Sequence, residues 1–291
     1  MDTTSLLARG QKKPASIKIL HAISLLLPGD WLKSFVFLNC IHRPRKLLRS
    51  LLFDFYRMDH IYDVIKEFTG NYQGNFSILE FGVAEGYSFV KKLYATRYLK
   101  CENRITIHGF DSFEGMPKDS GRCDQGLHAG DSWVEGQYQS DFKALVDCCA
   151  ARYENFQLHK GMFDATITED FVDRLRHTPP ILVWIDCDYY TSAKIVFERI
   201  LPALPSGCVI YFDEPYFNYG SRFTGEARLI HEINAGLLGE GIELVPDLAL
   251  SLASNRIYRF INLNASIGYE PMEKRFSAED RLLRNNGSPF P

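Results

Sequence analysis

The sequence has no hydrophobic run long enough to cross a membrane. Its most apolar N-terminal stretch, residues 17–28, is interrupted by Lys18 and His21, whereas a spanning helix needs about 20 consecutive apolar residues. The same stretch has no small-residue cleavage pattern, so it is not typical of a signal peptide. We therefore expect a cytoplasmic protein without a transmembrane segment.

Cysteine pairs with metal-binding or disulfide spacing are missing as well, and so is an excess of positive charge. The seven cysteines are an odd number with no Cys-x-x-Cys spacing, which is typical neither of a disulfide framework nor of a zinc site. The formal net charge is −3, whereas nucleic-acid-binding domains are normally basic with clustered Lys and Arg. The composition therefore argues against a disulfide scaffold and against a nucleic-acid partner.

Three familiar nucleotide and catalytic motifs do not occur. The chain has no Gly-x-x-x-x-Gly-Lys-Ser/Thr loop and no Gly-x-Ser-x-Gly elbow after a strand, which argues against a P-loop nucleotide hydrolase and an acyl-transfer triad. It also lacks the Gly-x-Gly-x-x-Gly dinucleotide fingerprint, whose glycines let the backbone approach a pyrophosphate. A nucleoside cofactor without a phosphate tail fits this chain better.

One acidic, glycine-containing turn is present and predicts a cofactor site. An apolar run at residues 78–81 contains Glu80 and is followed by Gly82 and Gly86, and a helical apolar period covers residues 87–99. This strand–turn–helix lets the backbone bend sharply beside a ligand. We expect the turn to surround the methionine part of S-adenosylmethionine, through Glu80, Phe81, Gly82, Gly86, Tyr87 and Ser88.

A second strand, about one βαβ unit further on, ends in Asp111. An acidic side chain at this position can accept hydrogen bonds from both ribose hydroxyls of a bound nucleoside. Asp111 and Ser112 are therefore predicted to hold the ribose, with Phe113 beside them. If the glycines were ordinary turn residues, Asp111 would instead be a helix N-cap.

Carboxylates end two further apolar runs. Residues 181–185 lead into Asp186, and residues 208–212 lead into Asp213 and Glu214. Carboxyl ends of parallel strands meet at one edge of a sheet, so these groups should converge, and Mg²⁺ is the default cation for such oxygen ligands. The alternative is a metal-free site in which Asp186 or His128 removes a proton. Asp188 is expected to cap the following helix.

The order of elements predicts a doubly wound α/β fold with a mostly parallel sheet. Residues 243–251 and 256–262 could add a closing antiparallel pair. We divide the chain into an N-terminal helical extension at 1–55, a central domain at 56–265 and a C-terminal tail at 266–291. The long loop at residues 115–139 contains Trp133, which would either close over a ligand or pin the loop to the core.

The N-terminal residues differ in charge from the rest. Residues 1–60 carry ten Lys and Arg against four Asp, or +6, while the remaining residues carry twenty-three against thirty-two, or −9. Basic and apolar residues mixed at 31–49 are compatible with weak contact to an anionic membrane surface. The other interpretation is a helical cap or a homodimer arm whose basic face is solvated.

Three segments resemble the macrocin O-methyltransferase family. They are Asp-Ser-Phe-Glu-Gly-Met-Pro at 111–117, Gly-Met-Phe-Asp-Ala-Thr at 161–166 and Trp-Ile-Asp-Cys-Asp-Tyr-Tyr at 184–190. The resemblance implies a class I, Rossmann-like, S-adenosylmethionine-dependent enzyme that methylates a hydroxyl of a sugar, glycan or glycosylated natural product. A noncatalytic cofactor-binding scaffold is the second hypothesis.

The same resemblance implies roles for particular residues. Gly161, Met162 and Phe163 would border the adenine. Asp186, Asp213 and Glu214 match positions that hold a divalent cation in the family, where the last of these is more often Asp. The chain therefore departs from the family pattern at Glu214.

Overall fold

The computed structural model describes residues 59–127, 132–247, 250, 256–265 and 268–269. The predicted N-terminal extension, nearly all of the predicted tail, and His128 lie outside the described residues. The chain divides into two compact units, Met1–Asp63 and Val64–Pro291. The fold described below is that of the second unit, together with the described residues 59–63 that begin its first helix.

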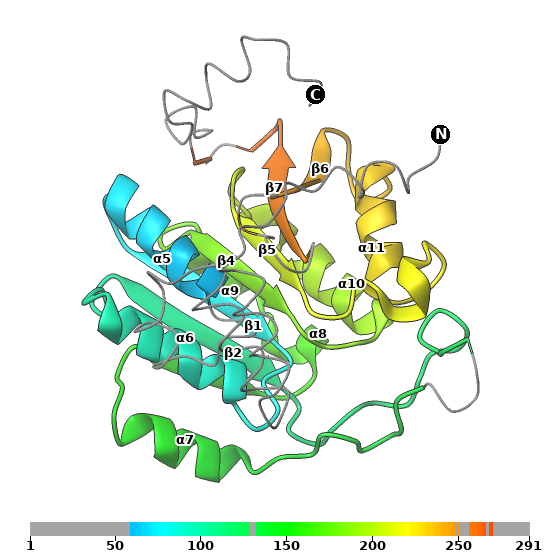
Figure 1. Ribbon diagram of the computed structural model, residues 1–291, viewed down its shortest axis with the longest axis horizontal. Helices are drawn as coiled ribbons and strands as arrows, with labels where there is room; N and C mark the ends of the chain where they lie inside the picture. Colours follow the sequence, from blue (N-terminus) through cyan, green and yellow to red (C-terminus); the bar gives the residue numbers. More distant parts are fainter. Residues whose placement is uncertain (1–58, 128–131, 248–249, 251–255, 266–267, 270–291) are drawn as a thin grey trace, which may run out of the picture. The chain divides into compact units, whose positions relative to one another are not determined.

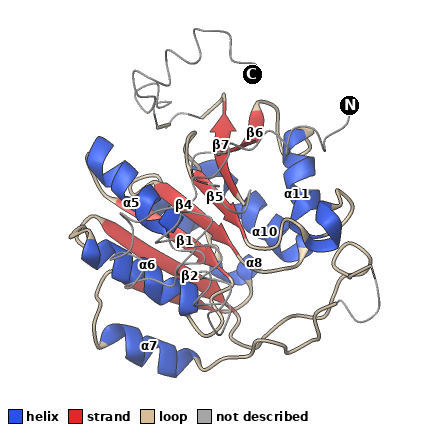
Figure 2. Cartoon of the chain, viewed as in Figure 1, coloured by secondary structure: helices blue, strands red, loops and turns tan. Residues whose placement is uncertain are grey.

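A seven-stranded sheet forms the centre of this unit, with the strand order β3-β2-β1-β4-β5-β7-β6 (Figures 1 and 2). The first five strands in the chain run parallel, and β7 pairs antiparallel with both β5 and β6. The strands are β1 (Phe76–Phe81), β2 (Ile105–Asp111), β3 (Phe156–Lys160), β4 (Pro180–Ile185), β5 (Val209–Phe212), β6 (Ile242–Pro246) and β7 (Ile257–Asn262).

Helices cover both faces of the sheet because the strands direct apolar side chains to both faces. Leu79 and Phe81 belong to a core cluster with Val196 and Phe197 of α10, whereas Glu80 faces Lys92 of α6. The helices are α5 (Asp59–Asn71), α6 (Tyr87–Tyr98), α7 (Phe142–Ala150), α8 (Phe163–Thr166), α9 (Glu169–Leu175), α10 (Tyr190–Ile200) and α11 (Gly225–Asn234), with short 3₁₀ turns η3 (Leu201–Ala203) and η4 (Phe217–Gly220).

The predicted fold class is confirmed. The expected strands ending near residues 81, 111, 185 and 212 are present, and β6 and β7 form the closing antiparallel pair. Within the described part of the chain, no helix is long and apolar enough to cross a membrane. What the sequence did not predict is the connection after β5, where η4 contains two residues with left-handed backbone, Asn218 and Tyr219.

Candidate functional site

The site forms where the strand order reverses, between β1 and β4. The chain leaves β1 toward β2 on one side and leaves β4 toward β5 on the other, and ligands of doubly wound sheets bind at the carboxyl ends of strands at such a point. Gly82 follows β1 with a φ of +90°, and a Cβ built on it would lie 1.7 Å from the backbone oxygen of Asp186. The predicted cofactor turn and the acidic end of β4 are therefore in direct backbone contact, which only glycine allows.

Helix α6 begins immediately after this turn. Gly86 is its N-cap, with a φ of +83°, and no side chain caps the helix there. The ring of Tyr87 is exposed, and Lys91 Nζ lies 3.2 Å from its centroid. An uncapped helix N-terminus presents backbone N–H groups and a partial positive charge to whatever lies beside the turn.

Glu80 lies beneath the turn and not on its surface. The side chain is fully buried, Oε2 accepts a hydrogen bond from Lys92 Nζ at 2.8 Å, and Oε1 accepts one from the Ser88 hydroxyl. Burial raises the pKa of the Glu80 carboxyl, and the buried Lys92 ammonium opposes that shift. Glu80 and Ser88 thus support the turn from below, and their direct contact with a cofactor stays a prediction.

Asp111 holds the same turn from the neighbouring strand. Its Oδ2 accepts hydrogen bonds from Val83 N and Ala84 N, each at 2.8 Å, and its Oδ1 accepts one from Phe113 N at 2.6 Å. A carboxylate has about four lone-pair sites, so further acceptance remains open to Asp111. Its neighbour Ser112 bonds within the following loop, through a 3.3 Å contact to the Gly115 carbonyl.

A third segment reaches this edge beside Asp111. Gly161 N donates to the Asp111 carbonyl oxygen at 2.9 Å, directly after β3. Met162 is exposed, and the ring of Phe163 meets that of Phe81 edge-on at 5.7 Å. The three segments predicted to bind the methionine, ribose and adenine parts are therefore adjacent along one edge of the sheet.

The acidic cluster lies at the ends of β4 and β5 and at the start of α11. Trp184 pairs with Tyr211, and Ile185 with Phe212, so the carboxylates that follow each strand are neighbours. We define the acidic cluster as Asp186, Asp188, Asp213, Glu214 and Glu226.

Burial and mutual repulsion set the protonation of this cluster. Burial, with the Asp213 charge next in importance, raises the pKa of Asp186 to about 8. Burial, with the Glu214 charge next, raises the pKa of Asp188 to about 7. Asp188 also has a φ of +60°, an uncommon conformation for a residue other than glycine and one that often marks a functional position.

Glu226 is a member of the cluster that the sequence did not indicate. It lies in the first turn of α11, it is fully buried, and its Oε2 accepts a hydrogen bond from Glu214 N at 2.9 Å. Its Oε1 has no hydrogen-bond partner among the described residues. Burial raises the pKa of Glu226 well above its ordinary value.

Positive charge reaches the cluster from Arg256, the residue before β7. The Arg256 Nη1 group donates to Asp213 Oδ1 at 3.1 Å and also to the Asp213 carbonyl oxygen. The Tyr211 hydroxyl donates to the same Oδ1 at 2.6 Å. Asp213 is therefore held on one side by protein donors.

The donor set fits a hard divalent cation by its chemistry. Carboxylate oxygens are the ligands that Mg²⁺ prefers, and a cation would offset the carboxylate repulsion that adds to burial in raising the pKa of Asp186 and of Asp188. Among the residues the structure describes, no three His, Cys, Asp or Glu side chains already form a metal-binding group. Asp186, Asp213 and Glu214 are therefore neighbours at the strand ends, and their joint binding of a cation stays a prediction.

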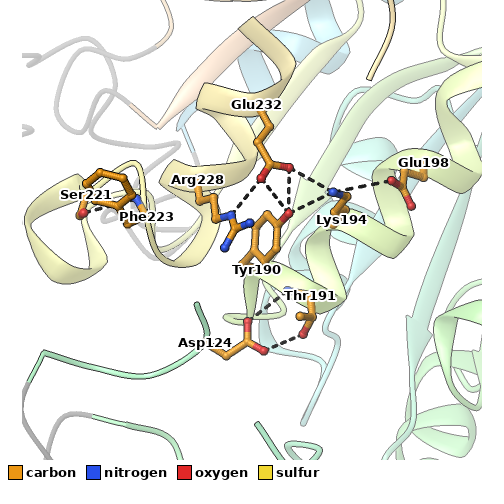
Figure 3. Close-up of polar contacts among 9 residues, drawn as sticks. All are labelled: Asp124, Tyr190, Thr191, Lys194, Glu198, Ser221, Phe223, Arg228 and Glu232. Carbon is orange, nitrogen blue, oxygen red and sulfur yellow. Dashed lines mark hydrogen bonds and ion pairs between the residues drawn. The ribbon is translucent and has the colours of Figure 1, made fainter. Parts of the chain in front are cut away.

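The long loop at residues 115–139 is fastened to the start of α10, as Figure 3 shows. Asp124 accepts hydrogen bonds from Thr191 N at 3.1 Å and from Thr191 Oγ1 at 2.8 Å. Asp124 is thus the capping group of this helix. The expectation that Asp188 caps α10 was wrong, because the N-cap position is Tyr189 and Asp188 turns into the acidic cluster.

A polar network anchors α10 to α11 beside this cap (Figure 3). Glu232 accepts hydrogen bonds from the Tyr190 hydroxyl at 2.8 Å, from Arg228 Nε at 2.9 Å and from Lys194 Nζ at 3.2 Å. Lys194 also lies 4.0 Å from Glu198. The network fixes the helix that begins just after Asp188.

Trp133 pins the loop to the rest of the unit. Its ring lies 4.6 Å from that of Phe217 and 5.9 Å from that of Tyr189, and its carbonyl oxygen accepts a 3.4 Å hydrogen bond from the Tyr189 hydroxyl. This geometry favours the interpretation in which Trp133 pins the loop to the core. The loop residues on each side of the undescribed stretch 128–131 are thereby held near the acidic cluster.

The raised pKa values of Asp186 and Asp188 predict that the contribution of these carboxyls to the stability of the metal-free protein falls as the pH rises from about 4 to about 8. The native state keeps protons on Asp186 and Asp188 that the unfolded state, with a carboxyl pKa of 3.8, has already released. More protons bound to the native state means that the free energy of unfolding falls as pH rises, until about pH 8. Melting temperatures in EDTA at pH 6.5 and 8 measure this.

The pH window and one variant separate the carboxyl contribution from that of the histidines. Burial lowers the pKa of His108 to about 3 and also lowers the pKa of His159, so both add an opposite contribution. What remains of it above the ordinary histidine pKa of about 6.5 is smaller than the loss from the two carboxyls. Asp188→Asn should flatten the decline. A melting temperature that rises across the window in wild-type protein would contradict the proposed protonation.

The fold is similar to that of solved methyltransferases. CalS11, a calicheamicin methyltransferase, is 20% identical with a TM-score of 0.51, and the match covers 91% of this chain and 99% of CalS11. The O-methyltransferase NovP is 15% identical with a TM-score of 0.49, covering 90% of this chain and 99% of NovP. No curated protein sequence matches the chain significantly. A family model described as a methyltransferase domain matches residues 79–214, from β1 to the acidic end of β5, and this match supports a methyltransferase.

Proposed function

We propose that this protein is an S-adenosylmethionine-dependent O-methyltransferase whose acceptor is a hydroxyl of a sugar or glycosylated small molecule. The observation that carries the proposal is the backbone contact between the Gly82 turn and Asp186. A cofactor bound over this turn would present its methyl group next to the acidic cluster. The methyltransferase-domain match over residues 79–214 supports the reaction class.

Methyl transfer requires that the protein hold the two reactants in position and provide a proton acceptor. The acceptor oxygen attacks the methyl carbon, the carbon–sulfur bond breaks, and its electrons return to sulfur to leave S-adenosylhomocysteine. Holding the two reactants in line supplies much of the rate enhancement. The hydroxyl proton passes to a carboxylate, and Asp188, with a pKa raised to about 7, is suited to accept it near neutral pH.

Asp186, Asp213 and Glu214 would hold Mg²⁺ in this proposal. The cation would lower the pKa of an acceptor hydroxyl and orient it. Arg256 and Tyr211 would keep Asp213 aimed at the site from the side of β7 and β5. Glu226, with one oxygen lacking a partner among the described residues, accepts a hydrogen bond from Glu214 N and so lies beside the proposed ligands.

Asp111→Ala tests the cofactor part of the proposal. The substitution removes the predicted ribose acceptor and also the carboxylate that holds Val83 N and Ala84 N. We expect the affinity for S-adenosylhomocysteine to fall by about 1–3 kcal/mol. Isothermal titration calorimetry measures the affinity directly.

Asp147→Ala is the matched control. Asp147 is exposed on α7 and pairs with Lys143 on the helix surface, so its removal should leave cofactor binding unchanged. Equal affinities for wild type, Asp111→Ala and the control would remove Asp111 from the cofactor site.

A further inference from the structure

Two neighbouring strands end in the same pattern, an aromatic residue followed by an apolar residue and Asp. In β4 the pattern is Trp184-Ile185-Asp186, and in β5 it is Tyr211-Phe212-Asp213. The register pairs Trp184 with Tyr211. Directly paired residues point to the same face of a sheet, so the two aromatic rings lie side by side, one layer below the two carboxylates.

The rings stack and direct their polar atoms at the carboxylates. Their centroids are 3.6 Å apart with an interplanar angle of 16°, and each residue is 1% exposed. Trp184 Nε1 donates to Asp186 Oδ2 at 3.2 Å, and the Tyr211 hydroxyl donates to Asp213 Oδ1 at 2.6 Å. Each buried ring thus donates to the acid two residues further along its own strand.

A buried cation lies under this ring pair and connects it to the Gly82 turn. Lys92 Nζ is 4.0 Å from the centroid of the Trp184 ring and 2.8 Å from Glu80 Oε2. Glu80 pairs with Trp184 in the β1–β4 register and accepts the Ser88 hydroxyl bond. A continuous set of contacts therefore runs from the start of α6 to the acidic cluster.

We infer that Trp184 and Tyr211 are positioning residues, which hold Asp186 and Asp213 at the distance and orientation that the reaction needs, with Lys92 fixing the Trp184 ring from below. The inference rests on the proposed function and deepens it. It assigns a role to two side chains that would not touch cofactor or acceptor.

Packing alone does not account for this arrangement. Phenylalanine would fill the same layer without a buried polar atom, and each buried N–H or O–H needs a partner. Neighbouring carboxylates repel, and the ring donors oppose this, together with Arg256 at Asp213. Outer hydrogen bonds that orient acidic ligands commonly change activity by about 10–100-fold when they are removed.

The test uses Trp184→Phe and Tyr211→Phe, each of which keeps an aromatic ring and removes one donor. We expect kcat for methyl transfer to fall about tenfold or more in each variant. The KM for S-adenosylmethionine should change by less than about twofold, because the cofactor turn is intact. A general loss of packing would not separate the two constants in this way.

Tyr269→Phe is the matched control at the other end of β4. The Tyr269 hydroxyl donates to the carbonyl oxygens of Pro179 at 3.2 Å and Pro180 at 3.3 Å. Tyr269→Phe removes a partly buried hydroxyl and leaves the carboxyl ends of the strands unchanged, so kcat should stay at the wild-type value. Wild-type kcat in both Trp184→Phe and Tyr211→Phe would overturn the inference.

A second measurement does not depend on turnover and so separates this inference from the proposed function. The chain has three tryptophans, and the Trp184 indole N–H resonance is identified by its loss in Trp184→Phe. The hydrogen bond to Asp186 Oδ2 shifts this resonance, so Asp186→Ala, which removes the acceptor, should move it and Asp147→Ala should not. An unmoved resonance in Asp186→Ala rejects the Trp184–Asp186 contact, whereas an inactive wild-type protein with the expected shift rejects only the proposed reaction.

Discussion

Replacing Lys92 by methionine is expected to lower the free energy of unfolding by about 3–5 kcal/mol. Lys92 and Glu80 form an ion pair at 2.8 Å with both side chains fully buried. Removing the cation leaves the Glu80 carboxyl in the interior, where it must either stay ionised without its partner or take up a proton. Urea unfolding followed by circular dichroism measures the loss.

The double variant Glu80→Gln/Lys92→Met separates the charge from the packing. A neutral pair of similar size should recover much of the stability, because breaking a buried pair costs more than replacing both partners. Lys143→Met is the surface control, since Lys143 and Asp147 are mostly exposed, and it should change stability by less than about 0.5 kcal/mol. If Lys92→Met changed the free energy of unfolding as little as Lys143→Met, the assignment of a buried Lys92–Glu80 ion pair would be wrong.

Chelation is expected to have the largest effect on activity. If a divalent cation orients the acceptor, EDTA and Asp213→Asn should each reduce turnover by about a hundredfold or more, since such a cation supplies several kcal/mol. Cofactor affinity should stay nearly constant, because the proposed nucleoside position is on the β1–β2 side of the site. Turnover with and without EDTA, together with calorimetry, measures both.

Recovery by added Mg²⁺ is the positive control for that experiment. Full turnover in EDTA would contradict the metal proposal and leave general-base or proximity catalysis. Asp188→Asn should then depress turnover steeply near neutral pH, because the Asp188 carboxyl, with a pKa raised to about 7, is the proposed proton acceptor. His128 remains a candidate for that role by sequence alone.

Local patterns predicted the parts of the site that follow directly from strand ends. An apolar run followed by Gly82 or by Asp186 indicates a strand and its carboxyl edge, and the parallel order of the sheet then brings such ends together. The helix period likewise located α6. These predictions needed no contact between distant residues beyond the register of a parallel sheet.

Contacts between distant segments could not be predicted in this way. Asp124 caps α10 across 67 positions of sequence, and no local pattern marks a capping residue supplied by a loop. Lys92 lies on the buried face of α6 among apolar residues, which is a weak signal for a buried partner but does not identify Glu80. In the sequence, Glu226 is an acidic residue in the first turn of a helix, which is a common position for such residues, so the sequence did not mark it as a site residue.

Transfer of a labelled methyl group tests the central claim most directly. Wild-type protein is incubated with methyl-labelled S-adenosylmethionine and a panel of sugars and glycosylated small molecules, in the presence of Mg²⁺. The account predicts that label appears on an acceptor hydroxyl and that one S-adenosylhomocysteine forms for each methyl transferred. Tight cofactor binding without label on any hydroxyl acceptor would contradict it and favour a noncatalytic cofactor-binding protein.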